Sequence, residues 1–173
     1  MTVVVADTSP LRYLAVIDCL RVIPALYEHV FVPGMVLAEL AHPNAPLEAR
    51  AFAASLPAWV EVAHANAAHL LNSLDPGEAE AIALAEAMRV DAILLDEREA
   101  RREAARRGLL TIGTVGILEQ AAARNLVDLA VVLGKLARTN FRIDPRYLDD
   151  ALRRDAARRE ADRSPERSRG REI

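Results

Sequence analysis

Short apolar segments alternate along this chain with longer segments in which apolar residues recur every three or four positions. The short segments are residues 3–6, 29–33, 59–63, 91–96 and 109–113. Polar, glycine or proline residues bound each of them, and their length is typical of strands buried in a sheet. The pattern therefore predicts five short strands.

The segments between the strands have the spacing of amphipathic helices. Pro10 suits the first turn of the first helix, with Thr8 or Ser9 as its N-cap, and Gly108 ends the most highly charged helix. The predicted helices cover residues 10–17, 33–41, 46–56, 74–90, 97–108, 114–125, 126–139 and 141–154. Strands that alternate with such helices predict an α/β fold with a parallel sheet covered on both faces.

The 173-residue length favours one compact domain, which we place at residues 1–150, followed by a tail at 151–173. Aromatic residues make up only 4% of the chain, as in many helix-rich α/β proteins. The tail is Arg-rich and contains many interleaved acids, so from Ala156 onward we expect disorder or frayed helix.

Charge and apolar content exclude several classes of protein. Residues 1–150 contain 14 Lys and Arg against 20 Asp and Glu, an acidic balance that argues against a broad nucleic-acid-binding surface. No apolar run approaches the ~20 residues of a membrane span, and the N-terminus lacks signal-peptide features. We therefore expect a soluble, cytoplasmic protein without membrane contact. The single Cys19 fits a reducing compartment, and the four histidines lack the spacing of a zinc site.

Two aspartates end predicted strands. Asp7 follows residues 3–6, and Asp96 ends residues 91–96. Parallel sheets bind ligands beyond the carboxyl ends of their strands, so both acids lie where a site is expected. The alternative for each is helix capping, although Thr8 and Ser9 suit that role better than Asp7 does. Glu97 follows Asp96 and is a candidate outer acid.

Two glutamates are further candidates. Glu39 is the only charged residue between Phe31 and Ala41, and it either belongs to the site or lies on the solvent face of its helix. Glu78 either faces the site or completes a capping box with Asp75, and the two roles can coexist. Glu80 points to nearly the opposite side of that helix, so Glu78 is the better site candidate.

Four acids brought together in one pocket would repel strongly unless a hard cation neutralised them. All-oxygen ligation suits Mg²⁺ or Mn²⁺. Such an ion lowers the pKa of a bound water and steadies charge on a phosphate, so phosphodiester hydrolysis is the natural chemistry. No phosphate-binding glycine loop, dinucleotide fingerprint or serine-nucleophile motif is present.

The motifs also occur in a recognisable order: "VVVADTSPL", "VFVPGMVLAEL", "LDPGEAEAIALA", "AILLDEREAR" and "TIGTVGIL". This order resembles PIN-domain ribonucleases, in particular the subfamily allied to the VapC toxins of toxin–antitoxin pairs. The resemblance covers about residues 1–150. It implies a three-layer α/β/α fold and a metal-dependent endonuclease for single-stranded RNA that is usually dimeric and silenced by an antitoxin.

Carried over residue by residue, the family's four acids fall on Asp7, Glu39, Glu78 and Asp96, and its hydroxyl beside the first acid falls on Thr8 or Ser9. Many relatives have another Asp or Asn shortly after the fourth acid. Here Glu97, Arg98 and Glu99 follow instead, and Thr114 is the only small polar candidate at the next strand end. This departure places a second metal ion in doubt.

The leading hypothesis is a ribonuclease whose four acids hold Mg²⁺ or Mn²⁺, and the ion activates a water for in-line attack on an RNA phosphodiester. The proposed metal ligands are Asp7, Glu39, Glu78 and Asp96, and Arg98, Arg101 and Arg102 steer the RNA strand. One rival is a PIN-like binding module with little turnover that dimerises or holds an antitoxin. A second rival, phosphoaspartyl chemistry, fits worse, because Ser9 occupies the position where a phosphatase of that class has its second Asp.

Overall fold

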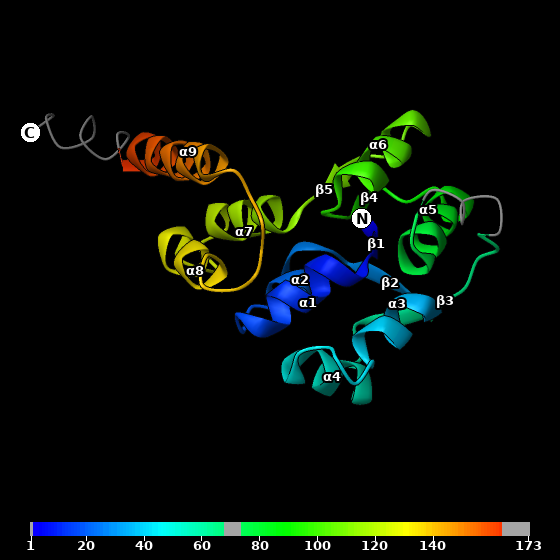
Figure 1. Ribbon diagram of the computed structural model, residues 1–173. Helices are drawn as coiled ribbons and strands as arrows, with labels where there is room; N and C mark the ends of the chain where they lie inside the picture. Colours follow the sequence, from blue (N-terminus) through cyan, green and yellow to red (C-terminus); the bar gives the residue numbers. More distant parts are fainter. Residues whose placement is uncertain (1, 68–73, 164–173) are drawn as a thin grey trace, which may run out of the picture. The chain divides into compact units, whose positions relative to one another are not determined.

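The computed structural model describes residues 2–67 and 74–163 of the chain (Figure 1). Close contacts divide it into two compact units, Met1–Ile117 and Leu118–Ile173. The first unit contains the whole sheet and all of the predicted site residues. None of the helices within the described ranges is long and apolar enough to cross a membrane.

The sheet of the first unit contains five parallel strands in the order β3-β2-β1-β4-β5. Their bounds are β1 Val3–Ala6, β2 His29–Pro33, β3 Val60–Ala63, β4 Ala92–Leu94 and β5 Thr111–Ile112. All five predicted strands are therefore present, although β4 and β5 are shorter than their segments. The fold class is confirmed: helices flank a central parallel sheet in three layers, α/β/α.

The strand order reverses between β1 and β4. The chain proceeds from β1 to β2 and β3 on one side, then returns to place β4 on the other side of β1 and adds β5 beyond it. In parallel sheets the crevice at such a switch point is where ligands bind. Asp7 directly follows β1, and Asp96 lies two residues beyond the end of β4. Both acids therefore lie at the switch point.

Six helices belong wholly to the first unit as described: α1 Thr8–Val16, α2 Val22–Leu26, α3 Gly34–Leu40, α4 Leu47–Ala54, α5 Pro76–Met88 and α6 Arg98–Arg106. Helix α5 is central, because it packs against β1, β2 and β4 and also against α3 and α6. Its alanines pack with Val5 and Ile93 of the sheet in one buried cluster. Small side chains let this helix lie close to the sheet. The start of α5 therefore lies near the switch point.

Local structure differs from the sequence prediction at three helix starts. The N-cap of α1 is Asp7, not Thr8 or Ser9, because both hydroxyl residues already lie inside the helix. Helix α6 has Glu97 as its N-cap residue without a side-chain cap, so Asp96 does not cap it. The short helix α2 was not predicted. The capping box formed by Asp75 and Glu78 at α5 is confirmed.

The second unit is helical. It contains the end of α7 (Thr114–Ala123), which begins in the first unit, together with α8 (Leu129–Leu136) and α9 (Pro145–Arg163). Arg154 donates to Glu119 at 2.9 Å, and Arg158 donates to the carbonyl of Ala122 at 3.1 Å. These bonds join α9 to α7 within the unit.

Helix α9 is longer than predicted. It continues past Ala156, where we expected disorder or frayed helix, and ends at Arg163. Ion pairs within the helix, such as Arg159 with Asp155 at 2.7 Å, explain how so polar a segment stays helical. Residues 164–173 of the expected tail lie outside the described residues, and the domain boundary near residue 150 stays a prediction.

Glu80 is a buried carboxylate that joins α5 to α3 and to the segment that follows β3. It lies on α5 and is 5% exposed. It accepts hydrogen bonds from the backbone N–H of Met35 at 2.7 Å and of Ala65 at 3.3 Å, and it lies 3.3 Å from His64 Nδ1. Met35 is in the first turn of α3, whose orphan N–H groups favour an acid. Glu80 thus fixes the helix that carries Glu39.

We expect Glu80→Ala to lower the free energy of unfolding by about 2–4 kcal/mol, because it removes a buried acceptor and leaves two part-buried backbone donors without one. Glu86→Ala is the matched control: it removes a glutamate from the same helix but breaks only a partly exposed ion pair with Arg107, which is worth at most about 1 kcal/mol. Urea unfolding of both variants measures the difference. Equal losses would show that Glu80 does not hold the fold in this way.

Candidate active site

Asp7 is the most buried of the predicted site acids, with 2% of its surface exposed. Its backbone N–H donates to the carbonyl of Leu94 at 3.0 Å, which ties the end of β1 to β4. Its Oδ2 accepts from the N–H of Ser9 in a long bond of 3.5 Å. The other oxygen, Oδ1, is buried and has no hydrogen-bond partner among the described residues. Burying such an oxygen is costly unless a water or a cation satisfies it.

Glu39 lies beside Asp7 and is held at both oxygens. The hydroxyl of Thr8 donates to Oε2 in a short hydrogen bond, and the backbone N–H of Gly77 donates to Oε1 at 2.9 Å. A Cβ at residue 77 would lie only 2.5 Å from Oε1, so glycine leaves the space that the carboxylate occupies. Glu39 is therefore turned inward to the start of α5 and is not a solvent-face glutamate.

Glu78 has both of the roles between which the sequence could not decide. Its N–H donates to Asp75 Oδ1 at 2.8 Å, while its own Oε2 accepts from the N–H of Asp75 at 3.3 Å. It is also only 7% exposed and close enough to Asp7 and Glu39 for their charges to interact. Glu80, in contrast, faces α3 and β3, as its opposite position on α5 predicts.

The electrostatics of these acids reflect burial first and repulsion second. Burial raises the pKa of Asp7 well above its usual range, the Thr8 amide lowers it, and the charges of Asp75, Glu78 and Glu39 raise it. Burial also raises the pKa of Glu39, and Asp75 adds to the effect, whereas Thr8 and Gly77 oppose it. Burial and the neighbouring Asp75 raise the pKa of Glu78 to about 7. Each group is therefore more costly to ionise here than in water.

Asp96 has different neighbours. Its Oδ1 accepts from the backbone N–H of Thr114 at 2.7 Å, and its Oδ2 accepts from the Thr114 hydroxyl at 2.6 Å. Burial raises the pKa of Asp96, while the bonds from Thr114 and the charge of Arg101 lower it and Glu97 raises it. The acid that ends the β4 segment therefore anchors the first residue of α7 and lies beside a cation.

The structure thus places the predicted site acids in two separate groups. Asp7, Glu39 and Glu78 form one acidic group around the starts of α1 and α5, and Asp96 forms a second group with Thr114 and Arg101. Glu97 is exposed, and its charge acts on both Glu78 and Asp96. Within residues 2–67 and 74–163, no three His, Cys, Asp or Glu side chains are close enough to form a ready coordination shell.

Sequence reasoning treated Asp75 only as a helix cap, whereas its charge raises the pKa of all three acids in the first group. Its position in the capping box, directly before the helix that carries Glu78, was the available signal. Thr8 and Thr114 were candidates without an assigned partner, and each now has one: Glu39 and Asp96.

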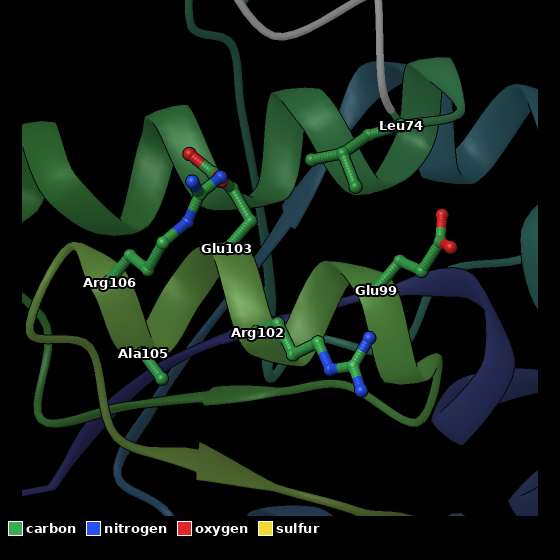
Figure 2. Close-up of a pocket in the computed structure, with 6 residues that line it drawn as sticks. All are labelled: Leu74, Glu99, Arg102, Glu103, Ala105 and Arg106. Carbon is green, nitrogen blue, oxygen red and sulfur yellow. The ribbon is translucent and has the colours of Figure 1, made fainter.

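A separate hollow lies along α6 (Figure 2). Its lining residues are Leu74, Glu99, Arg102, Glu103, Ala105 and Arg106. Arg106 meets Glu103 there in an ion pair, and none of the four predicted acids lines the hollow. It therefore does not form part of the candidate active site.

His69 lies outside the described residues.

Comparisons with known proteins agree with this geometry. The family model described as "PIN domain" matches residues 3–157, which is most of the chain. Comparison with curated proteins and comparison with solved structures each gave no significant match. The matched range includes the whole sheet and every predicted site acid. The chain therefore belongs to the PIN-domain family.

Proposed function

We propose that the protein is a Mg²⁺- or Mn²⁺-dependent endoribonuclease that hydrolyses phosphodiester bonds of single-stranded RNA. PIN domains are generally nucleases and typically use divalent metal ions, and this chain is a PIN domain. The observation that carries the proposal is the buried, unpartnered Oδ1 of Asp7 at the switch point of the sheet. The finer resemblance to VapC-like toxins remains part of the proposal.

The residues around Asp7 fit a hard divalent cation. They supply carboxylate oxygens, which Mg²⁺ and Mn²⁺ prefer, and a cation there would relieve both the orphaned oxygen and the mutual repulsion of the acids. In the proposal Asp7, Glu39 and Glu78 hold the ion, with Asp96 at the adjacent strand end. Such an ion supplies a water of lowered pKa and neutralises charge on the phosphate.

The chain's own groups have defined tasks in this proposal. Thr8 and Gly77 orient the Glu39 carboxylate, and the capping box orients Glu78. Hydrolysis forms a bond from the water oxygen to phosphorus and breaks one ester bond, and the proton from water ends on the leaving ribose oxygen. The pKa of about 7 that burial gives Glu78 belongs to the metal-free protein, and a bound cation would lower this pKa, so Glu78 would hold the ion as a carboxylate at neutral pH.

The start of α6 supplies positive charge for an RNA strand. Arg98 and Arg102 are both exposed, and neither has an ion pair among the described residues. They are four residues apart and therefore share one helix face. Exposed arginines of this kind contact phosphates without selecting sequence, which suits steering of the strand.

The rival is a PIN-like module that binds a partner with little turnover. The observation in its favour is that the described acids do not form a ready coordination shell. In the ribonuclease proposal the cation draws these carboxylates together when it binds. The two hypotheses differ in what replacement of Asp7 does to cleavage.

Asp7→Asn is expected to lower metal-dependent cleavage of RNA by at least about 100-fold, because it removes a charged ligand of the proposed ion. Gel assays with a panel of single-stranded RNAs, with and without Mg²⁺ or Mn²⁺, measure the effect. Asp18→Asn is the control, since Asp18 is exposed and its positive φ of 58° suits asparagine. Equal cleavage by the Asp7→Asn variant and the unaltered protein would rule out the proposal.

The metal-free protein is expected to lose stability as pH rises from about 4.5 to about 7. Glu78 has its pKa raised from 4.5 to about 7. The folded state therefore binds more protons than the unfolded state between these two pH values. The contribution of Glu78 to the free energy of unfolding is fully present below pH 4.5 and is lost as the pH rises to about 7. The contribution is up to about 3 kcal/mol. Unfolding curves of the unaltered protein and Glu78→Gln, taken across this range without metal, measure it.

Glutamine can still complete the capping box, so Glu78→Gln removes the titration and keeps the helix start. The variant should show a flatter pH dependence. Added Mg²⁺ should raise the melting temperature of the unaltered protein more at pH 8 than at pH 5. The same slope in both proteins would mean that Glu78 does not titrate in this environment.

The proposal includes two protein partners, a second copy of the chain and an antitoxin that silences cleavage. Light scattering is expected to give a mass of about twice the chain's 18.9 kDa. The product of an adjacent short gene, added at equal concentration, is expected to stop RNA cleavage. A monomer over the working concentration range would contradict the dimer, and unchanged cleavage would contradict that antitoxin assignment.

A further inference from the structure

Arg101 lies at the carboxyl edge of the sheet, beside the fourth predicted acid. It is on α6, and its Nη1 donates to the carbonyl of Leu95, directly after β4, at 3.3 Å. This is the only hydrogen bond of its side chain among the described residues, although a guanidinium has five N–H donors. The side chain is partly exposed. Several donors are therefore free to bind a ligand at this edge.

The Arg101 guanidinium and the Asp96 carboxylate both approach Gly113. A Cβ at residue 113 would lie 2.8 Å from Arg101 Nη1 and 2.9 Å from Asp96 Oδ1. The glycine thus leaves a space into which both groups reach. Thr114 fixes the carboxylate through hydrogen bonds of 2.7 and 2.6 Å, so the negative charge that attracts Arg101 is held in place.

The other arginines of α6 lack this combination. Arg106 pairs with Glu103, and Arg107 pairs with both Glu103 and Glu86. Arg98 and Arg102 are exposed on the surface of the helix. Arg101 alone of the arginines described on α6 is both held beside a predicted site acid and left with unused donors. Its placement is therefore that of a positioned cation, not a mobile surface charge.

We propose that Arg101 is a catalytic residue that binds the non-bridging oxygens of the scissile phosphate, with Asp96 and Thr114 as its positioning residues. Many phosphodiester nucleases use two metal ions, one near each side of the phosphate. Here the fourth acid is followed by Glu97, which is exposed, and Arg101 brings a positive charge to that side. The inference rests on the proposed ribonuclease function and makes it a one-ion reaction.

The chemistry suits the assignment. Arginine donates two parallel hydrogen bonds to a phosphate, and these strengthen as negative charge grows on the phosphate oxygens in the transition state. A donor fixed before the substrate arrives needs no reorganisation during the reaction. The hydrogen bond to the Leu95 carbonyl and the attraction of the Asp96 carboxylate provide that fixation.

The test compares Arg101→Gln and Arg101→Lys with Arg102→Gln, which removes the same charge from the neighbouring residue. Single-turnover cleavage at saturating RNA measures the chemical step, and Mn²⁺ titration followed by electron paramagnetic resonance measures ions bound per chain. Arg101→Gln is expected to lower the maximal rate about 100-fold, a loss typical of a single transition-state donor, with Mn²⁺ affinity within about threefold of normal. Arg102→Gln is expected to alter RNA affinity more than the maximal rate.

The Arg101→Lys variant distinguishes a catalytic role of Arg101 from a role in folding alone. It keeps the charge beside Asp96 but loses the paired donors, so its maximal rate should fall about tenfold with no change in melting temperature. A full rate in Arg101→Lys, a rate for Arg101→Gln equal to that of Arg102→Gln, or two Mn²⁺ ions per chain would each overturn the inference and leave the ribonuclease intact. An unaltered protein that cleaves no RNA would instead remove the proposed function itself.

Discussion

The buried carboxylate of Asp7 is the constraint on which the rest of the site depends. The pairing of β1 with β4 places Asp7, directly after β1, at the switch point of the sheet. Its Oδ1 is buried there and has no hydrogen-bond partner among the described residues. An ionised carboxylate in such surroundings is unfavourable by several kcal/mol unless a cation is nearby. A fold that keeps this group at its centre therefore gives up stability there, which is characteristic of a functional site.

Helix starts supply the compensation that the chain itself provides. Asp7 is the N-cap of α1, Glu39 accepts from Gly77 at the start of α5, and Asp96 accepts from Thr114 at the start of α7. The N-terminus of a helix carries a partial positive charge, so three acids are each bound by a different helix. This arrangement lets three carboxylates lie at one edge of the sheet. The partial charges of the helix N-termini are smaller than the charge of a divalent ion, so they neutralise the carboxylates only in part.

The sequence predicted the strands, the sheet type and most helices, because short apolar runs and helical spacing are local signals. It did not predict α2, whose five residues are too few to show a period, nor that Asp7 caps α1. The partners of Glu39, Glu80 and Arg101 lie on other elements, so no local pattern reveals them. Strand ends and helix positions pointed to the four acids and the resemblance agreed with them, whereas their division between two groups required the tertiary structure.

The most direct test of the account is a crystal structure of the protein with Mn²⁺, in which anomalous scattering locates the ion. The account predicts one strong peak roughly 2.0–2.3 Å from Asp7 Oδ1, with oxygens of Glu39 or Glu78 in the same coordination shell and Arg101 unmoved beside Asp96. A structure with saturating Mn²⁺ that shows no peak near Asp7, or shows Oδ1 bonded to another protein group, would contradict the metal centre.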